Sequence, residues 1–527
     1  MKMNWKIFCV ILFAVTLSSC AASRKTVVEE TSSNEADYHY MRSVDAQLSQ
    51  NWEEALQELQ LALKETPDSA YLKTELSQLY MKTKRMDDAV RTAEEVVSRY
   101  PDYEPALSLL GQMYSSQKKI KKAISMYEKL IKISPEVTQN YIHLAYLCAM
   151  DNQFEKAVGA LEKVLAMDPY NLMGRYTLGR IYIETKEYDK AIEELEKVVE
   201  SNPALWDAYN LLGVAYESTD NIEKAVSSYQ ESIKLNVHNI EARKRLALMY
   251  LKQEKADEAV GQLKEISKLY PDSLEAHGIL AKIYFDEKKY EDAEKEVRII
   301  ISAQPENANA LLLLGRILGV QQKYEEAVKQ FDKLEKLMPE STEVKVTFGQ
   351  LYLQKKDYEE AGKKFRKALD MEPDNDEALY FLAVTYDKEK RYSEMFFYMK
   401  KTIEVNPNHI EALNYLGYTY ADKGINLDEA QALIEKAIEL DPDSGYIRDS
   451  LGWVYYKKGR YKEALGEIKQ ALEMEENDPV IYEHLGDIYL KLDNKEAAED
   501  AWRKSLEFHE KEEGLKERVE KKLQDLK

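Results

Sequence analysis

One stretch of the chain has the residue types of a nucleophilic site. The run GYIRDSLGWVYYKKGRY, from Gly445 to Tyr461, places Asp449 directly before Ser450 among aromatic residues. A serine nucleophile needs a general base, most often His, within hydrogen-bond reach, and a third group that orients the base. No His stands at a helical spacing from Ser450. The stretch therefore does not predict a reaction.

Other residues that could carry chemistry are scattered. The seven histidines show no metal-ligand spacing: His39, His143, His238, His277, His409, His484 and His509. The chain contains no Gly-rich phosphate loop, no His-Glu-x-x-His and no Cys-x-x-Cys. With three cysteines no zinc site or disulfide framework can be drawn, and Cys148 is expected to be a buried core thiol. We expect no enzyme activity, no metal, no cofactor and no small-molecule substrate.

Composition indicates an acidic, helical protein. Its 95 acidic and 74 basic residues give a net charge of −21, which disfavours nucleic acid as a partner. Leu, Ala, Glu and Lys are abundant, whereas only 19 Gly and 13 Pro occur in 527 residues. This composition favours long helices. The 37 tyrosines are an excess that requires a structural reason.

The N-terminus has the pattern of an export signal. Lys2 and Lys6 are followed by IFCVILFAVTL, Ile7 to Leu17, which is too short to span a bilayer but fits a signal-peptide core. The next residues, LSSC, resemble the bacterial lipobox, which implies cleavage before Cys20 and lipidation of its thiol. Ala21 favours the outer membrane under the sorting rule of that family. An ordinary secretory signal with a chance Cys is the alternative.

These features divide the N-terminus into two predicted segments. Residues 1–19 are the predicted lipoprotein signal peptide, and residues 20–35 the predicted lipidated N-terminus and flexible tether. We therefore expect a cell-envelope protein that is held by lipid at the outer membrane and faces the periplasm.

The rest of the chain repeats every 34 residues. One alanine recurs at this interval from Ala55 to Ala361, and one proline recurs at 34 or 68 residues from Pro67 to Pro407. When the alanine is numbered position 20, fourteen repeats fill residues 36–512, with one extra residue in the twelfth. Position 8 is usually Gly or Ala, and positions 11 and 17 are often Tyr, which accounts for much of the tyrosine excess.

This pattern resembles the tetratricopeptide repeat, a helix–turn–helix unit. The resemblance implies an all-α, right-handed superhelix (an α-solenoid) of about 14 repeats, with the first helix of each pair lining a concave groove. Small residues at positions 8 and 20 would let paired helices approach closely, and neighbouring repeats would stack into one core. Residues 513–527 break the pattern and carry an apolar stripe, so we expect a capping helix there.

Helical geometry sorts the first helix of each repeat into two stripes. Positions 4, 7, 8 and 11 form the expected core, and positions 2, 5, 9, 12 and 13 lie nearly opposite. We call the latter stripe the first-helix face; by the resemblance it lines the groove. Gly452 and Tyr455 are then framework residues, Ser450 lies at the margin, and the neighbouring Asp and aromatic residues face the groove.

The regular pattern fails mainly in repeats 11 to 13, where the first-helix face is also richest in aromatic residues. Met395 replaces the small residue at position 20 there. The predicted protein-binding residues are Tyr380, Asn414, Tyr418, Asp449, Trp453 and Tyr456. A second candidate face in repeats 4 and 5 comprises Ile142, Tyr146, Met150, Met173, Tyr176 and Arg180. The alternative is that these aromatic side chains merely pack on one another.

Resemblance also suggests a role. Asn414 to Tyr456 is similar to the C-terminal part of a group of proteobacterial tetratricopeptide lipoproteins, one of which is an adaptor for a C-terminal processing protease. The carboxylate clamp of chaperone-binding relatives is not assembled, because Leu248 stands where that clamp needs Asn. We expect a scaffold or adaptor that binds other proteins or peptides. The alternative is a lipoprotein of an envelope polysaccharide export or secretion complex.

Overall fold

The computed structural model describes residues 34–512 and 514–526, and every regular element in these ranges is a helix. The predicted signal peptide, Cys20 and all but the last two residues of the predicted tether lie outside them. Helix α2 begins at Asn34, so Asn34 and Glu35 are helical and not part of a flexible tether. No helix of the described residues is both long enough and apolar enough to span a bilayer.

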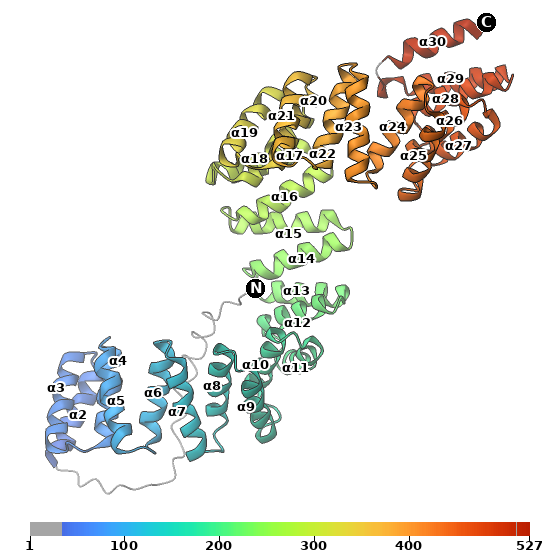
Figure 1. Ribbon diagram of the computed structural model, residues 1–527. Coiled ribbons are helices and arrows are strands. Elements are labelled where there is room, and N and C mark those ends of the chain that lie inside the picture. Colours follow the sequence, from blue (N-terminus) through green and yellow to red (C-terminus); the bar gives the residue numbers. More distant parts are fainter. Residues whose placement is uncertain (1–33, 513, 527) are drawn as a thin grey trace. The chain divides into compact units, whose positions relative to one another are not determined.

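Each of the fourteen predicted repeats is a pair of helices (Figure 1). The first helices are α2 (Asn34–Leu48), α4 (Ala70–Lys82), α6 (Glu104–Ser116), α8 (Thr138–Met150), α10 (Leu172–Glu184), α12 (Trp206–Ser218), α14 (Ile240–Lys252), α16 (Leu274–Asp286), α18 (Ala308–Val320), α20 (Thr342–Gln354), α22 (Asp376–Lys388), α24 (Ile410–Lys423), α26 (Gly445–Lys457) and α28 (Pro479–Lys491). The second helices are α3 (Trp52–Glu65), α5 (Met86–Arg99), α7 (Ile120–Ile133), α9 (Phe154–Met167), α11 (Tyr188–Ser201), α13 (Ile222–Leu235), α15 (Ala256–Leu269), α17 (Tyr290–Ala303), α19 (Tyr324–Leu337), α21 (Tyr358–Met371), α23 (Tyr392–Val405), α25 (Leu427–Leu440), α27 (Tyr461–Met474) and α29 (Lys495–Glu507).

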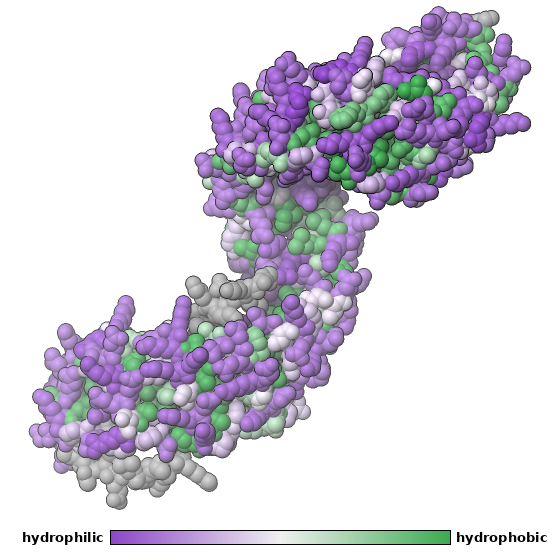
Figure 2. Space-filling model, in the orientation of Figure 1, coloured by the Kyte–Doolittle hydropathy of each residue, from purple (hydrophilic) through white to green (hydrophobic). Residues whose placement is uncertain are grey.

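The described residues form two compact bodies, an N-terminal one that ends at Ala259 and a C-terminal one that begins at Val260, with the division inside α15. The surface seen in Figure 2 is mostly hydrophilic in both. The predicted face of repeats 4 and 5 belongs to the N-terminal body. The predicted face of repeats 11 to 13 belongs to the C-terminal body.

A left-handed residue at position 15 ends the first helix of every repeat. Eleven repeats in succession use a residue other than Gly there, from Gln50 (φ 58°) to Lys390 (φ 61°). In repeat 12 the extra residue is accommodated by two left-handed residues, Gly424 (φ 68°) and Asn426 (φ 49°). Because a single left-handed residue reverses the chain, the two helices of a repeat lie antiparallel with a very short connection.

The small residue at position 8 is needed because a large side chain at position 24 lies against it. A Cβ added at Gly452 would lie 2.8 Å from Ile468 side-chain carbons, and one added at Gly111 would lie 2.8 Å from the Tyr127 ring. The prediction that small residues permit close approach of the paired helices is confirmed. A side chain there would displace the residue at position 24.

Tyrosines at position 11 tie several repeats to the one before. Five of their hydroxyls bond a polar side chain twenty residues earlier, at position 25 of the preceding repeat: those of Tyr80, Tyr114, Tyr216, Tyr250 and Tyr386. Gln230 donates to the Tyr250 hydroxyl at 2.8 Å, and the Tyr114 hydroxyl donates to Glu94. The rings themselves are largely buried. The tyrosine excess therefore supplies both core and inter-repeat hydrogen bonds.

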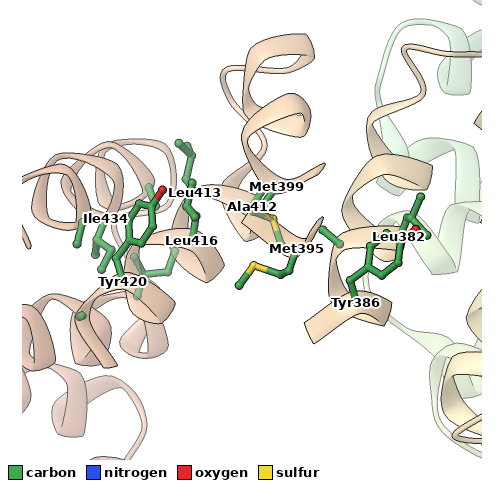
Figure 3. Close-up of a cluster of buried hydrophobic side chains, with 14 of the residues drawn as sticks. Leu382, Tyr386, Met395, Met399, Ala412, Leu413, Leu416, Tyr420 and Ile434 are labelled. Atoms are coloured by element: carbon green, nitrogen blue, oxygen red, sulfur yellow. The ribbon is translucent and has the colours of Figure 1, made fainter. Parts of the chain in front are cut away.

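Met395, the departure from the alanine rule, is fully buried. In Figure 3, Met395 and Met399 of α23 lie between Leu382 and Tyr386 on one side and the Leu413–Leu416 part of α24 on the other. An unbranched, flexible side chain is suited to filling such an irregular gap. The substitution is therefore explained by packing.

The predicted capping helix is present as α30 (Leu515–Leu526), after a short 3₁₀ turn (His509–Lys511). Leu515 and Val519 of its apolar stripe are buried against Trp502 of α29. Leu523 and Leu526 pack at the margin of the same cluster. This helix covers the apolar side of the last repeat.

Candidate functional site

Four of the six residues predicted in the C-terminal body converge on His484. The carboxylate of Asp449, on α26, lies 2.8 and 3.0 Å from His484 Nδ1, on α28. The Trp453 ring stacks on the imidazole at 4.1 Å, and the Tyr456 ring stacks on Trp453 at 4.7 Å. Tyr418, on α24, lies 6.5 Å from the imidazole. We call these five residues the His484 cluster.

The expectation that Asp449 and Trp453 are open to a groove is wrong. Their exposed fractions are 7% and 8%, because His484 of the following repeat covers both. Trp453 belongs to the hydrophobic core of the C-terminal body, and the Lys457 ammonium lies 4.9 Å from its ring. The packing alternative therefore describes Asp449 and Trp453, whereas Tyr418 and Tyr456 remain half-buried at the surface.

The environment of His484 favours its protonated form. Burial lowers the pKa of His484, but the negative charge of Asp449, with those of Asp487 and Glu483 farther off, more than offsets this and raises the pKa above its ordinary value. The imidazolium and Asp449 thus form a buried ion pair. Burial also raises the pKa of Tyr456 to about 12, so its hydroxyl stays protonated.

The His484 cluster does not activate Ser450. The Ser450 hydroxyl donates to the Tyr446 carbonyl at 3.1 Å, one turn back in its own helix, and its side chain is buried. The only carboxylate–imidazole contact in the cluster joins Asp449 to His484. His484 was not predicted from the sequence, because it lies on the next repeat, outside the helix that carries Asp449 and Ser450. The signal was available one repeat later, 35 residues after Asp449.

Two polar atoms among the predicted residues have no hydrogen-bond partner within the described part of the chain. They are Asn414 Oδ1, an acceptor on α24, and Trp453 Nε1, a donor on α26. Both atoms are shielded from bulk solvent. A buried polar atom left unpaired costs about 1–3 kcal/mol, so such atoms need an explanation.

Tyr380 belongs to a second aromatic group at the same face. Its ring lies 4.9 Å from His409 and 6.3 Å edge-on from Tyr415. The Tyr415 hydroxyl donates to Asp387 at 2.8 Å, which fixes this group between α22 and α24. Tyr380 itself is half-buried.

Helix α30 contributes positive charge beside the His484 cluster. Arg518 and Lys522 form ion pairs with Glu483 at 2.9 and 2.8 Å, and Lys522 also pairs with Asp487 at 2.7 Å. Burial alone would raise the pKa of Glu483, but hydrogen bonds from the two cations hold it below its ordinary value. Glu483 and Asp487 occupy positions 5 and 9, so α30 covers the first-helix face of the last repeat.

The second candidate face, in the N-terminal body, is less open than expected. Ile142, Tyr146, Tyr176 and Arg180 are buried, and only Met150 and Met173 are partly exposed. The Tyr176 hydroxyl donates to Asp207 of the next repeat, and Arg180 lies 5.8 Å from the Tyr176 ring. Neighbouring repeats therefore occupy much of this face.

Cys148 is fully buried beside this second face, as expected, and burial raises the pKa of its thiol to about 11. A thiol with so high a pKa is mostly protonated and unreactive at neutral pH. No group of His, Cys, Asp and Glu in the described residues could hold a metal ion.

Family models match most of the repeats. A tetratricopeptide repeat model matches residues 46–113 and 250–317, and two further models of the same repeat match 452–493 and, in two pieces, 410–444 and 480–510. The tetratricopeptide domain of cytochrome c-type biogenesis protein H matches residues 296–409. The C-terminal ARM domain of tetratricopeptide repeat protein 21 matches residues 106–277. The comparison with curated proteins finds no match.

Solved structures with similar helix arrangements include yeast Tom70, which is 18% identical over 86% of this chain and 99% of its own, with a TM-score of 0.41. YrrB, described as a TPR protein with an unusual peptide-binding site, is 20% identical over 35% of this chain and 95% of its own, with a TM-score of 0.32. MamA from Desulfovibrio magneticus is 22% identical over 32% of this chain and 96% of its own, with a TM-score of 0.31.

Proposed function

Because the chain is built of tetratricopeptide repeats, we propose that it is a lipid-anchored periplasmic scaffold whose first-helix face in repeats 11 to 13 binds partner proteins. The observation that carries the proposal is the group of half-buried aromatic side chains that the first helices of these repeats leave at the surface, Tyr380, Tyr418 and Tyr456. The role that the resemblance of Asn414 to Tyr456 favours is recruitment of a C-terminal processing protease.

The chemistry of this face suits an extended peptide. The exposed parts of Tyr380, Tyr418 and Tyr456 provide apolar surface for its side chains. Because aromatic rings have few rotatable bonds, they lose little conformational entropy on binding and are frequent hot spots.

The proposed location rests on the N-terminal sequence. Cleavage before Cys20 and acylation of its thiol would leave a polar segment between the lipid and α2. Each buried methylene adds about 0.8 kcal/mol to membrane affinity, so multiple acyl chains give a stable anchor. Ala21 favours the outer membrane.

Affinity purification from solubilised envelope tests both parts of the proposal. The bait protein is compared with an Asn414→Ala/Tyr456→Ala variant, which alters the face without removing core side chains. Phe397→Ala is the matched control, because this aromatic side chain of α23 is 62% exposed and lies outside the predicted site. A processing protease that is recovered with the wild type and control, and lost with the variant, is the expected result.

Recovery of other proteins would change the proposed function. If export-channel subunits are recovered in place of a protease, the chain belongs to an envelope export or secretion complex. If all three baits recover the same partners in the same amounts, binding does not use this face. Recovery from the cytoplasmic fraction alone would contradict the proposed location.

A further inference from the structure

A cleft with a volume of about 600 Å³ lies between α21 and α23, the second helices of repeats 10 and 11. Most of its lining residues lie on these second helices, whereas the first-helix face lies on the first helices. Its volume falls in the range of sites that bind ligands, which is about 300–1,000 Å³. Its cationic lining residues are Lys363, Lys364, Arg366, Lys367 and Lys401. We call this feature the α21–α23 cleft.

The charge of the cleft is opposite to that of the chain. Five cations line it against two carboxylates, Glu360 and Asp370, whereas the chain as a whole carries −21. The source is the sequence GKKFRK in α21, which places cations at positions 22, 23, 25 and 26. No other repeat carries more than two cations at these four positions. The positive charge is thus a property of repeat 10 and not of the repeat framework.

Only two of the five cations form ion pairs with carboxylates of the described residues. Lys363 pairs with Glu359 and Glu360, and Lys364 pairs with Glu335 at 2.7 Å while lying 4.0 Å from the Phe348 ring. The other three have no carboxylate partner among the described residues, although the Arg366 guanidinium lies 3.4 Å from the Tyr386 hydroxyl and Lys401 donates to the Pro373 carbonyl at 3.2 Å.

Gly362 leaves room for this arrangement. A Cβ at this position would lie 3.1 Å from Arg366 Nη1, so a larger residue would shift the guanidinium by a few tenths of an ångström. The uncharged lining comes from Leu369, Pro373, Leu379 and Tyr398. The cleft therefore combines unpaired cations with apolar side chains from three helices.

We propose that the α21–α23 cleft binds an acidic peptide segment of a protein partner. Carboxylates of the peptide would pair with Arg366, Lys367 and Lys401, and an apolar side chain would contact Leu379 and Tyr398. A compact phosphate would contact the cations but leave the apolar lining uncovered. The proposal rests on the protein-binding role proposed above but assigns a second site on a different face.

Fluorescence anisotropy with a labelled heptapeptide of alternating Glu and Leu tests this site. The wild type is compared with Arg366→Glu/Lys367→Glu, in which both altered side chains are exposed. The matched control is Lys329→Glu/Lys333→Glu on α19, which makes the same change in net charge at exposed positions of the preceding repeat. We expect the cleft variant to bind at least about tenfold more weakly and the control to bind within about twofold of wild type.

Three results would overturn the proposal. Equal weakening by both variants would show a long-range field effect in place of a site. Absence of wild-type binding to the peptide at low salt would exclude an acidic peptide. Binding to phosphatidylglycerol vesicles that depends on Arg366 and Lys367, without peptide binding, would assign the cleft to a lipid surface. Asn414→Ala/Tyr456→Ala should leave this binding unchanged, so failure of one site is distinguishable from failure of the other.

Discussion

Replacement of His484 by Phe separates the ion pair that this residue forms with Asp449 from its stacking on Trp453. The Phe ring keeps the stacking surface on Trp453, but the imidazolium that pairs with Asp449 is lost. Asp449, which is 7% exposed, would then be a buried carboxylate without its cation. Removing one partner of a buried ion pair costs about 3–5 kcal/mol. We expect a destabilisation of this size in repeats 13 and 14.

The effect should depend on pH in a defined direction. The pKa of His484 is raised in the folded protein, so the charged form contributes stability that is complete below the unfolded pKa of about 6.5 and is lost as pH rises through the folded pKa. The charged or titratable groups that face it are Asp449, Glu483, Asp487 and Tyr418. The difference between wild type and variant should therefore be largest near pH 6 and shrink at higher pH.

Amide hydrogen exchange is the suitable assay, because long repeat arrays do not unfold in one step. At about 1.4 kcal/mol per tenfold change, the loss corresponds to roughly two to three and a half orders of magnitude faster exchange in α26 and α28. Helices α18 and α20 provide an internal control. Asp449→Leu/His484→Phe should recover most of the protection, since neither charge remains. Unchanged exchange, or a difference that grows with pH, would refute the buried ion pair.

Three further outcomes are expected. Cys20→Ala should release the protein from the membrane fraction, as measured by fractionation, and retention of this variant would exclude the lipid anchor. Deletion of residues 513–527 should lower solubility and the melting temperature, because it exposes the apolar cluster around Trp502 to water and removes the ion pairs of Glu483 with Arg518 and Lys522. Unaltered melting would contradict the capping role. Trp453→Ala should lower the free energy of unfolding by about 3–5 kcal/mol, because the ring belongs to the core. Tyr418→Ala, at a half-buried position, should lower it less and act mainly on partner binding. Equal shifts of the melting temperature for the two variants would contradict this distinction.

Much of the fold could be predicted from the sequence because each repeat encodes the same local contacts. The small residue at position 8 and the tyrosine at position 11 recur, and both have the packing roles that their spacing indicates. The capping helix could be predicted from its apolar stripe for the same reason. These features depend on neighbours within one repeat or the next.

The candidate site was harder to predict because its exposure depends on which side chain the next repeat supplies. Helical geometry placed Asp449 and Trp453 on the first-helix face, but it could not show that His484 would cover them. Position 6 varies widely among the other repeats, from Glu and Arg to Leu and Phe, and is His in only one of them, repeat 4, so no rule of the repeat assigns this contact. The left-handed turn residue was also missed, since Lys, Gln, Asn and Asp all occupy it.

That turn residue limits how the chain can change in length. Left-handed backbone costs a residue with a side chain about 1–2 kcal/mol, and Gly and Asn tolerate it best. The one turn with an inserted residue needs this conformation twice and has Gly424 and Asn426 at those two places. In the other turns, a one-residue insertion would require a second left-handed residue from a segment rich in Lys and Glu. A one-residue insertion is therefore tolerated only in a turn that has first acquired Gly or Asn. Gain or loss of a whole 34-residue repeat, by contrast, leaves the other turns unchanged.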